Sequence, residues 1–319
     1  MLDQLTNPMI TVFGSINVDL VLKVGHLPLP GETVLCPTYE AVAGGKGANQ
    51  ALAAAQAGAD VRMVGCVGQD GFADIALHDL TAANVELSNI QQTLSPTACA
   101  AVMVDAKGEN SIVVASGANL DAKATQIPED ALRPGDLLVL QMEVPHEENW
   151  IAVRRAHVGG AKTMLSVAPV APVPPEILDI VDYVLVNEIE GRAIAVASDN
   201  NVIDRMQLPG ALSRRHGFLC VMTLGRDGAI AANGETEWRI PALPVKEVVD
   251  TTGAGDAFAG CFAAAMSRGQ GVEDALRFAS IGAGLSCSSL GAQPSFPTAK
   301  AILQEEWDEL RTIESPLSK

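Results

Sequence analysis

A glycine-rich turn near the C-terminal end of the chain combines residue types that suit anion binding and proton transfer. Residues 250–256, with the sequence DTTGAGD, precede an alanine-rich apolar run that stops at Gly269, which predicts a helix starting at the glycines. The first N–H groups of a helix lack partners and lie at the positive end of its dipole, so they can bind an anion. Gly253 and Gly255 carry no Cβ, so an anion can approach their backbone closely. The turn therefore predicts an anion site with the Asp256 carboxylate beside it.

This turn also allows other interpretations. An aspartate in a first helical turn can serve only to stabilise the helix dipole. A dinucleotide-binding fingerprint would need glycine at position 258, which is Phe. A Walker loop would need Gly-Lys followed by Ser or Thr, and the one such pair, Gly45-Lys46, is followed by Gly47. Phosphoryl transfer to an alcohol needs a base for the hydroxyl proton and donors around the transferred group, and this turn offers both.

The elements that must position these residues alternate between strand-like and helical patterns. Helical patterns cover 46–57 and 72–83 and begin again near 255 and 272, and short apolar strands lie between them. Such alternation predicts βαβ units and a mostly parallel sheet covered by helices on both faces. The strands are expected at 10–13, 61–65, 136–141, 163–167, 183–186 and 218–223, with a further strand-like segment at 247–250 and a frayed tail after Leu310.

Two stretches interrupt this alternation. Residues 17–43 contain three prolines among alternating apolar residues, and residues 99–115 have the pattern of a hairpin with its turn at 105–108. Neither stretch has room for a crossover helix. They predict antiparallel strands that stand off the main sheet as a lid, or alternatively edge strands of that same sheet.

Composition and charge limit the class of protein. The 319 residues are 48% apolar with a net charge of −17, which disfavours binding to nucleic acid or anionic membranes. Apolar runs are too short for a membrane span, and the first residues lack the features of a secretory signal. Six cysteines without a Cys-x-x-Cys pair indicate small, buried, reduced thiols. Together these features predict a cytoplasmic protein with a large core.

A second glycine-rich segment, GGKGANQ at residues 44–50, combines with residues 250–256 to carry a family resemblance. With the two segments in this order, the chain resembles the ribokinase branch of the PfkB-type carbohydrate kinases over about residues 10–297. The resemblance implies a ribokinase-like three-layer α/β sandwich with a mostly parallel central sheet. The whole chain, 1–319, would form a single domain, with a β lid formed from about residues 15–43 and 97–117. It also implies a homodimer that pairs through the lid, whose apolar face would otherwise be exposed.

The resemblance implies roles for individual residues. Asp256 would be the base, with the amides of Gly253, Ala254 and Gly255 forming an anion hole. Lys46 would reach the γ-phosphate of ATP, and a cation at a helix N-terminus is otherwise unfavourable. Glu190 would help to place Mg²⁺ through water. Sugar contacts are implied for Asn17, Asp19, Gly45, Lys46, Gly47, Asn49, Glu143 and Asp256, and nucleotide contacts for Asn187, Thr223, Gly225, Gly228, Gly255 and Ser280.

For two of these groups the residues alone allow a simpler role. Asn17 and Asp19 follow a strand, where they could form an Asx turn. Asn187 and Glu190 could be the N-cap and a first-turn acid of a helix. The resemblance further implies a K⁺ or other monovalent cation that orders the anion hole, bound mainly by carbonyls of Asp250, Thr252, Ser286, Ser289, Gly291 and Ser295.

Asn17 and Asp19 in the turn after the first strand, the full 44–49 segment and Glu143 all match the family together, which favours D-ribose as the substrate. Deoxyribose, fructose or a nucleoside remain alternatives within the family, because one hydroxyl contact can decide between them. A non-catalytic sensor of sugar or nucleotide would be expected to have lost Asp256 or the glycines, and both are present. The chain departs from the family at Ser166-Val167, where Asn-Pro is common. This departure affects the expected contacts with the nucleotide more than those with the sugar.

Overall fold

The structure is a computed structural model that describes residues 8–197, 204–305 and 312–317. Within them, the main sheet has ten strands in the order β14-β13-β12-β11-β10-β9-β8-β1-β4-β5. The segment 1–7, which belongs to the stretch tested for a secretory signal, lies outside the described residues. The strands are β1 (Met9–Phe13), β4 (Asp60–Gly68), β5 (Glu86–Thr93), β8 (Leu137–Leu140), β9 (Lys162–Ser166), β10 (Tyr183–Asn187), β11 (Leu219–Thr223), β12 (Ala229–Ala232), β13 (Thr236–Ile240) and β14 (Ile313–Pro316).

Most of this sheet is parallel, as the alternating pattern predicts. The strands from β5 to β11 along the sheet pair in parallel, and β12, β13 and β14 continue it as antiparallel strands. The central strands are short runs of Val, Leu and Ile, buried because helices cover both faces.

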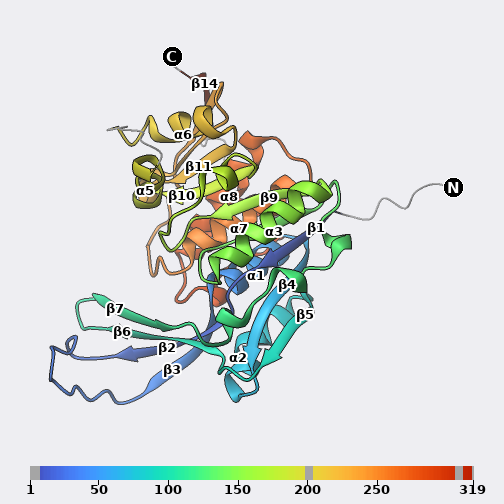
Figure 1. The fold of residues 1–319 in the computed structure, drawn as a ribbon. Coiled ribbons are helices and arrows are strands. Elements are labelled where there is room, and N and C mark those ends of the chain that lie inside the picture. The colour runs from blue at the N-terminus through green and yellow to red at the C-terminus, as the bar shows by residue number, and fades with distance from the viewer. Residues whose placement is uncertain (1–7, 198–203, 306–311, 318–319) are drawn as a thin grey trace.

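Helices form a layer on each face of the sheet (Figure 1). Each layer packs on the sheet through its own cluster of buried apolar residues. On one face lie α1 (Lys46–Gln56), α2 (Gly71–Ala82), α7 (Ala254–Ser267) and α8 (Val272–Ser286), with α9 (Ala299–Gln304) against α8. On the other lie α3 (His146–Gly159), α4 (Pro175–Leu178), α5 (Glu188–Ala197) and α6 (Leu208–His216). The predicted three-layer α/β architecture is therefore confirmed.

A second sheet projects from the body, as the blue and green strands at the lower left of Figure 1 show. Its order is β3-β2-β6-β7, so none of its strands is an edge strand of the main sheet. The prediction of antiparallel strands is wrong at one position, because β2 and β6 pair in parallel and join two antiparallel pairs. Its strands are β2 (Asn17–Lys23), β3 (Tyr39–Gly44), β6 (Ala98–Val104) and β7 (Asn110–Ala115).

Two local predictions are wrong. Residues 247–250 form no strand, because the amides of Val249 and Asp250 both donate to the carbonyl of Cys287 at the end of α8. The tail after Leu310 is not frayed throughout, because β14 pairs with β13 at the sheet edge. Among the described residues, no helix is long and apolar enough to cross a membrane.

The strand order reverses at β1, and this reversal locates a crevice. β1 pairs with β4 on one side and β8 on the other, and Phe13 is in register with both Val64 and Leu140. Residues that follow β1 and β8 therefore emerge side by side at the carboxyl edge of the sheet. In open α/β sheets such a reversal is where ligands bind.

Helices α1 and α7 approach closely next to this crevice. A Cβ on Gly260 of α7 would lie only 2.7 Å from the carbonyl oxygen of Gln50 and 2.8 Å from the amide of Ala54. The absence of a side chain at this position lets the two backbones meet. This contact brings the first turn of α1 against the first turn of α7.

Candidate active site

Asp256 lies in the first turn of α7, and its side chain is buried with only 9% of the residue exposed. Its Oδ2 accepts a hydrogen bond from Asn49 Nδ2 at 3.0 Å, and its Oδ1 accepts one from Gln50 Nε2 at 2.9 Å. Burial raises the pKa of Asp256, while the charge of Lys46 and the two amide donors act in the opposite direction. The result is a carboxylate that is desolvated, oriented and more basic than an exposed aspartate.

The turn before Asp256 has open backbone donors, as the sequence predicts. Gly253 precedes α7 in the left-handed region at φ 76°, a conformation that favours glycine. The amide of Ala254 donates to the carbonyl of Thr251 at 3.2 Å, whereas for Gly253 and Gly255 no hydrogen bond is found to any described residue. A Cβ on Gly255 would meet nothing within 4 Å, so its backbone faces open space. Of the three predicted donors, those of Gly253 and Gly255 are thus free for an anion.

Lys46 supplies a positive charge beside Asp256. It lines a cavity of about 190 Å³ together with Asn187, Glu190, Gly255 and Asp256. The negative charge of Asp256 is the largest cause of the raised pKa of Lys46, and Glu143, Glu190 and Asp19 add to it against the effect of burial. The ammonium therefore stays charged and balances a group of four carboxylates.

The glycines of the 44–47 segment permit close backbone contacts around Ser15. Gly45 has φ 90°, and a Cβ on Gly47 would lie 2.6 Å from the amide of Ser15. Glu143 Oε2 accepts hydrogen bonds from Ser15 Oγ at 2.6 Å and from the Lys46 amide at 3.1 Å, so it satisfies a free donor at the start of α1. Glu143 thus connects the segments that follow β1 and β8.

The second sheet meets the body at another cavity of about 410 Å³. Asn17, Asn119 and Glu143 contribute polar groups to its lining, and Val114 of β7 contributes an apolar wall. The Nδ2 of Asn119, in the short 3₁₀ segment 117–121, donates to Asn17 Oδ1 at 2.7 Å. Asn17 is therefore held by a side chain that the sequence analysis did not identify.

Asp19 lies two residues after Asn17 on β2, with its carboxylate against Gly44. A Cβ on Gly44 would be only 2.4 Å from Asp19 Oδ2. Burial, followed by repulsion from Glu143, raises the pKa of Asp19 to about 6, although Lys46 partly opposes this shift. Asp19 is thus a carboxylate whose charge is costly in the folded protein.

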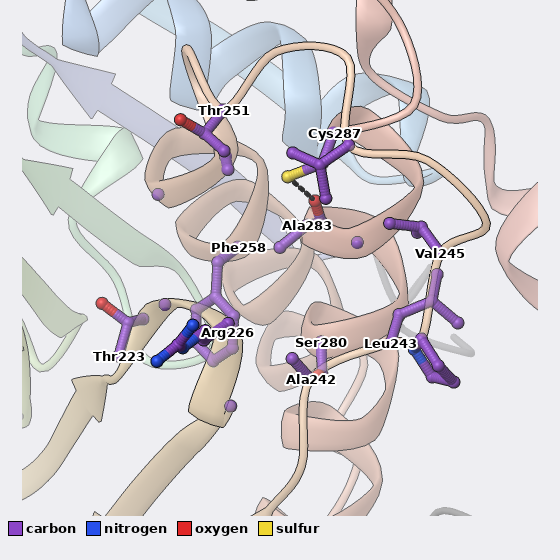
Figure 2. Close-up of a pocket in the computed structure, with 17 residues that line it drawn as sticks. Thr223, Arg226, Ala242, Leu243, Val245, Thr251, Phe258, Ser280, Ala283 and Cys287 are labelled. Atoms are coloured by element: carbon purple, nitrogen blue, oxygen red, sulfur yellow. Dashed lines mark hydrogen bonds between the residues drawn. The ribbon is translucent and has the colours of Figure 1, made fainter.

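A large cavity of about 660 Å³ borders the anion turn (Figure 2). Thr223, Gly225, Gly228, Gly255 and Ser280 all line it, so the structure brings these predicted residues together. Its walls are mostly apolar, with Leu243, Val245 and Ala283 around Ser280. The Ser280 hydroxyl donates to the carbonyl of Pro241 at 2.9 Å, so its hydrogen is already engaged. Arg226, which sequence reasoning did not single out, adds a cation to the lining.

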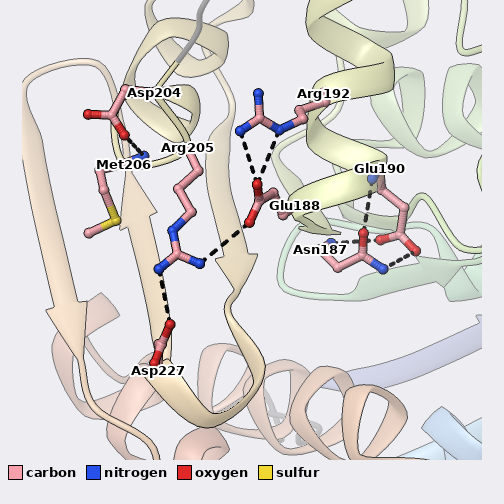
Figure 3. Close-up of polar contacts among 8 residues, drawn as sticks. All are labelled: Asn187, Glu188, Glu190, Arg192, Asp204, Arg205, Met206 and Asp227. Carbon is pink, nitrogen blue, oxygen red and sulfur yellow. Dashed lines mark hydrogen bonds and ion pairs between the residues drawn. The ribbon is translucent and has the colours of Figure 1, made fainter.

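Asn187 and Glu190 form a reciprocal cap at the start of α5 (Figure 3). The amide of Glu190 donates to Asn187 Oδ1, and both the amide and Nδ2 of Asn187 donate to the Glu190 carboxylate, at 2.7–2.9 Å. The structural role allowed by the sequence is therefore confirmed. Asn187 is in register with Thr223, which places the cap beside the large cavity.

Arg205 connects this cap region to the turn after β11 (Figure 3). It pairs with Glu188 at 3.5 Å and with Asp227 at 3.0 Å, and Glu188 also pairs with Arg192. Exposed ion pairs of this kind contribute little to stability. Their main consequence is to hold the turn 225–227 next to the start of α5.

The residues implied for a monovalent cation form two groups. Asp250 Oδ1 accepts hydrogen bonds from the amide and hydroxyl of Thr252, and Oδ2 accepts one from the amide of Gly291 at 2.9 Å. Asp250 thereby ties the anion turn to the segment after α8. Ser286 and Ser295 donate their hydroxyl hydrogens to carbonyls of their own turns, so their hydroxyl oxygens keep lone pairs for a cation, as do the carbonyls of Ser286, Ser289 and Ser295.

The described side chains offer few ligands for a divalent metal ion. Among the described residues, no group of three or more His, Cys, Asp or Glu side chains could enclose a metal. Each oxygen of the Glu190 carboxylate accepts a hydrogen bond from Asn187 and keeps a further lone pair. A single carboxylate of this kind fits Mg²⁺ that keeps its waters and is held mainly by a ligand's phosphates.

The chain is similar to known proteins over most of its length. A model of the pfkB family of carbohydrate kinases matches residues 7–299. The chain belongs to this family. A ribokinase of Bacillus subtilis (strain 168) is 38% identical over 296 residues, which cover 92% of this chain and 97% of that protein.

Solved structures of the family agree in fold. A ribokinase from Thermotoga maritima has a TM-score of 0.86 and 32% identity, covering 93% of this chain and 98% of that one. The Arabidopsis thaliana ribokinase complexed with ribose and ATP has a TM-score of 0.84 and 30% identity, covering 94% and 98%. The predictions of the family, of a ribokinase-like fold and of a carbohydrate kinase are confirmed, whereas the role of each site residue stays a prediction.

The raised pKa of Asp19 predicts a stability effect with a definite sign. The folded carboxyl binds its proton more tightly than the unfolded one, so stability falls as pH rises from about 4 to above 6. Asp19→Asn removes this cost, and we expect the variant to be more stable than the wild type by about 2 kcal/mol at pH 8. At pH 4 the two proteins should be nearly equal in stability.

Chemical denaturation at both pH values measures this difference. Asp130→Asn, at an exposed carboxylate outside the site, serves as the matched control and should change stability little at either pH. If Asp19→Asn has no advantage at pH 8, or keeps the same advantage at pH 4, the stated electrostatics of Asp19 are wrong.

Proposed function

We propose that this protein transfers the γ-phosphate of ATP to the primary hydroxyl of D-ribose and forms D-ribose 5-phosphate. The observation that carries the proposal is the position of Asp256, a buried carboxylate at a helix N-terminus that lines a small polar cavity together with Lys46. The neighbouring Gly255 lines both this cavity and the large apolar one. The relatives support the choice of substrates, since the similar Arabidopsis protein is a ribokinase complexed with ribose and ATP.

In this proposal Asp256 is the general base. It accepts the proton of the sugar hydroxyl as the oxygen attacks the γ-phosphorus, and the bond from phosphorus to the β-phosphate oxygen breaks, releasing ADP. Burial supports this role because it makes the carboxylate a better proton acceptor. Negative charge on the transferred group is stabilised by the open amides of Gly253 and Gly255 and by the ammonium of Lys46.

The sugar would occupy the cavity at the base of the second sheet. Asn17, Asp19 and Glu143 would hydrogen-bond its hydroxyls, and the segment containing Gly45, Gly47 and Asn49 would cover it. The nearness of Asn17 and Glu143 to the same cavity supports this assignment. The second sheet would act as a lid that excludes water during transfer.

The nucleotide would occupy the large cavity, with adenine against the apolar wall near Ser280. Thr223, Gly225 and Gly228 would lie along its ribose and phosphates, next to Asn187. Mg²⁺ bound to the phosphates would neutralise their charge, and Glu190 would hold one of its waters. K⁺ or another monovalent cation would order the turn through Asp250 and the carbonyls around Gly291, whose amide already donates a hydrogen bond to Asp250.

We also propose a homodimer formed through the lid in the cytoplasm. Edge strand β7 exposes three successive apolar residues, Ile112, Val113 and Val114, at 47–64%, and a second copy would cover them. All six cysteines are free, which suits a reducing compartment.

Light scattering tests the dimer. The wild type is expected at twice the 33.2 kDa chain mass, and Val113→Glu at the monomer mass, because the new charge would be buried at the interface. Val158→Glu, at an 88% exposed site on α3, should leave the dimer intact. A wild type that is monomeric at micromolar concentration contradicts the proposal.

A coupled assay of ADP release tests the proposed reaction over ribose, deoxyribose, fructose and adenosine, with K⁺ or Na⁺ as the salt. We expect kcat/KM for ribose to exceed that for every other acceptor by at least about tenfold, because a site built around a hydroxyl disfavours analogues without it. K⁺ is expected to give the higher rate.

The outcomes separate the candidate functions. A preference for deoxyribose would favour the second candidate, which has its own support in a Salmonella typhi deoxyribokinase that is 32% identical over 298 residues. Release of ADP that does not depend on any acceptor, or no release at all, would contradict the assignment as a sugar kinase and leave a sensor as the alternative.

A further inference from the structure

Two chains of buried side-chain amides end on the two oxygens of Asp256. On one side, Gln293 Nε2 donates to Asn49 Oδ1 at 3.1 Å, and Asn49 Nδ2 donates to Asp256 Oδ2. On the other side, Gln141 Nε2 donates to Gln50 Oε1 at 2.8 Å, and Gln50 Nε2 donates to Asp256 Oδ1. All four amides are buried, with 6% or less of each residue exposed.

The direction of both chains follows from the charge at their end. An ionised carboxylate can only accept hydrogen bonds, so Asn49 and Gln50 must turn their NH₂ groups toward Asp256. Their oxygens then face outward, and the next residues, Gln293 and Gln141, must donate in turn. A side-chain amide can exchange the positions of its oxygen and its NH₂ group. The carboxylate therefore selects one of the two orientations for each of the four amides.

The far ends of the chains show that this arrangement is not the best one for stability alone. Gln141 Oε1 and Gln293 Oε1 are both buried, with no hydrogen-bond partner among the described residues. A buried acceptor without a partner costs about 1–3 kcal/mol, and an apolar side chain at either position would only move this cost to Gln50 or Asn49. The cost therefore comes with burying the Asp256 carboxylate together with its donors. Polar groups retained in spite of such a cost are expected at functional sites.

The hydrogen bonds restrict rotation of the Asp256 carboxylate, which sets the direction of its lone pairs. The carboxylate can turn about its Cβ–Cγ bond, where the torsional preference is broad. Donors on both oxygens oppose this turn, because rotation in either direction breaks two hydrogen bonds together. The donors also come from separate elements: Gln141 follows β8, Asn49 and Gln50 belong to α1, and Gln293 begins the 3₁₀ turn 293–295 after α8.

We propose that Gln141 and Gln293 are positioning residues for catalysis: through Gln50 and Asn49 they fix the plane of the Asp256 carboxylate so that one lone pair faces the attacking hydroxyl. This inference rests on the proposed role of Asp256 as base. It gives functions to two residues that lie outside both glycine-rich segments and that need not touch the sugar or the nucleotide.

Gln293→Leu removes the donor to Asn49 with little change in size. We expect kcat to fall by roughly tenfold or more, since misplacing a catalytic group by a fraction of an ångström has effects of this order. KM values for sugar and ATP should change by less than about twofold. Gln293→Glu keeps the shape but cannot donate when ionised, so it should draw the Asn49 amide away from Asp256 and reduce kcat at least as much.

A set of double mutants separates positioning from a merely structural role. In an Asn49→Ala background, Gln293→Leu should have little further effect on kcat. In a Gln50→Ala background it should have its full effect. Gln141→Leu should show the opposite pattern, coupled to Gln50 and additive with Asn49. Gln92→Leu, at an exposed glutamine of β5, is the matched control and should leave kcat unchanged.

Two results would overturn the inference. One is a Gln293→Leu enzyme with wild-type kcat. The other is an equal loss of kcat from Gln293→Leu in the wild-type, Asn49→Ala and Gln50→Ala backgrounds, in proportion to the loss of thermal stability. A direct readout is independent of turnover. The side-chain amide protons of Asn49 should exchange slowly with solvent in the wild type and faster in Gln293→Leu, measured by NMR. If the wild type phosphorylates no sugar, the proposed function fails, and unchanged Asn49 exchange in the variant would separately refute the relay.

Discussion

The site depends on keeping one negative charge, that of Asp256, inside the protein. A buried carboxylate without partners is strongly disfavoured, so the fold must supply donors and an opposite charge. It does so with the amides of Asn49 and Gln50, the positive end of α7 and the ammonium of Lys46. The same burial makes the carboxylate a stronger base than an exposed aspartate. Stability and catalysis are therefore linked through a single desolvated group.

This requirement explains why distant parts of the chain meet at the crevice beside β1. The reversal of strand order places the segments after β1 and β8 together, and Glu143 joins them through Ser15 and Lys46. The close contact of α1 with α7 at Gly260 then brings the donors of α1 to Asp256. Gly255 of the anion turn lines both the large cavity and the small polar cavity that Asp256 lines, so two ligands can approach the same carboxylate. The family's sugar-kinase chemistry is consistent with such a two-sided site.

Much of this could be predicted from the sequence where the signal is local. Apolar strands, alanine-rich helices and the two glycine-rich segments identified the fold class and placed Lys46 and Asp256 in one site. Longer-range features could not be predicted. β5 is polar on both faces along much of its length, so alternation did not reveal it, and residues 247–250 have a strand-like pattern but bond to Cys287 instead. Gln141 and Gln293 show no pattern at all, because their importance arises only when separate elements pack together.

The central claim, that a buried Asp256 is the base, is tested most directly by Asp256→Asn in single-turnover measurements at saturating sugar and ATP. The account predicts that the rate of phosphoryl transfer falls by about 10²–10⁴-fold, the usual contribution of a general base. Sugar and nucleotide affinities, measured by calorimetry, should change far less. A variant that transfers phosphate at a rate close to that of the wild type would contradict the account.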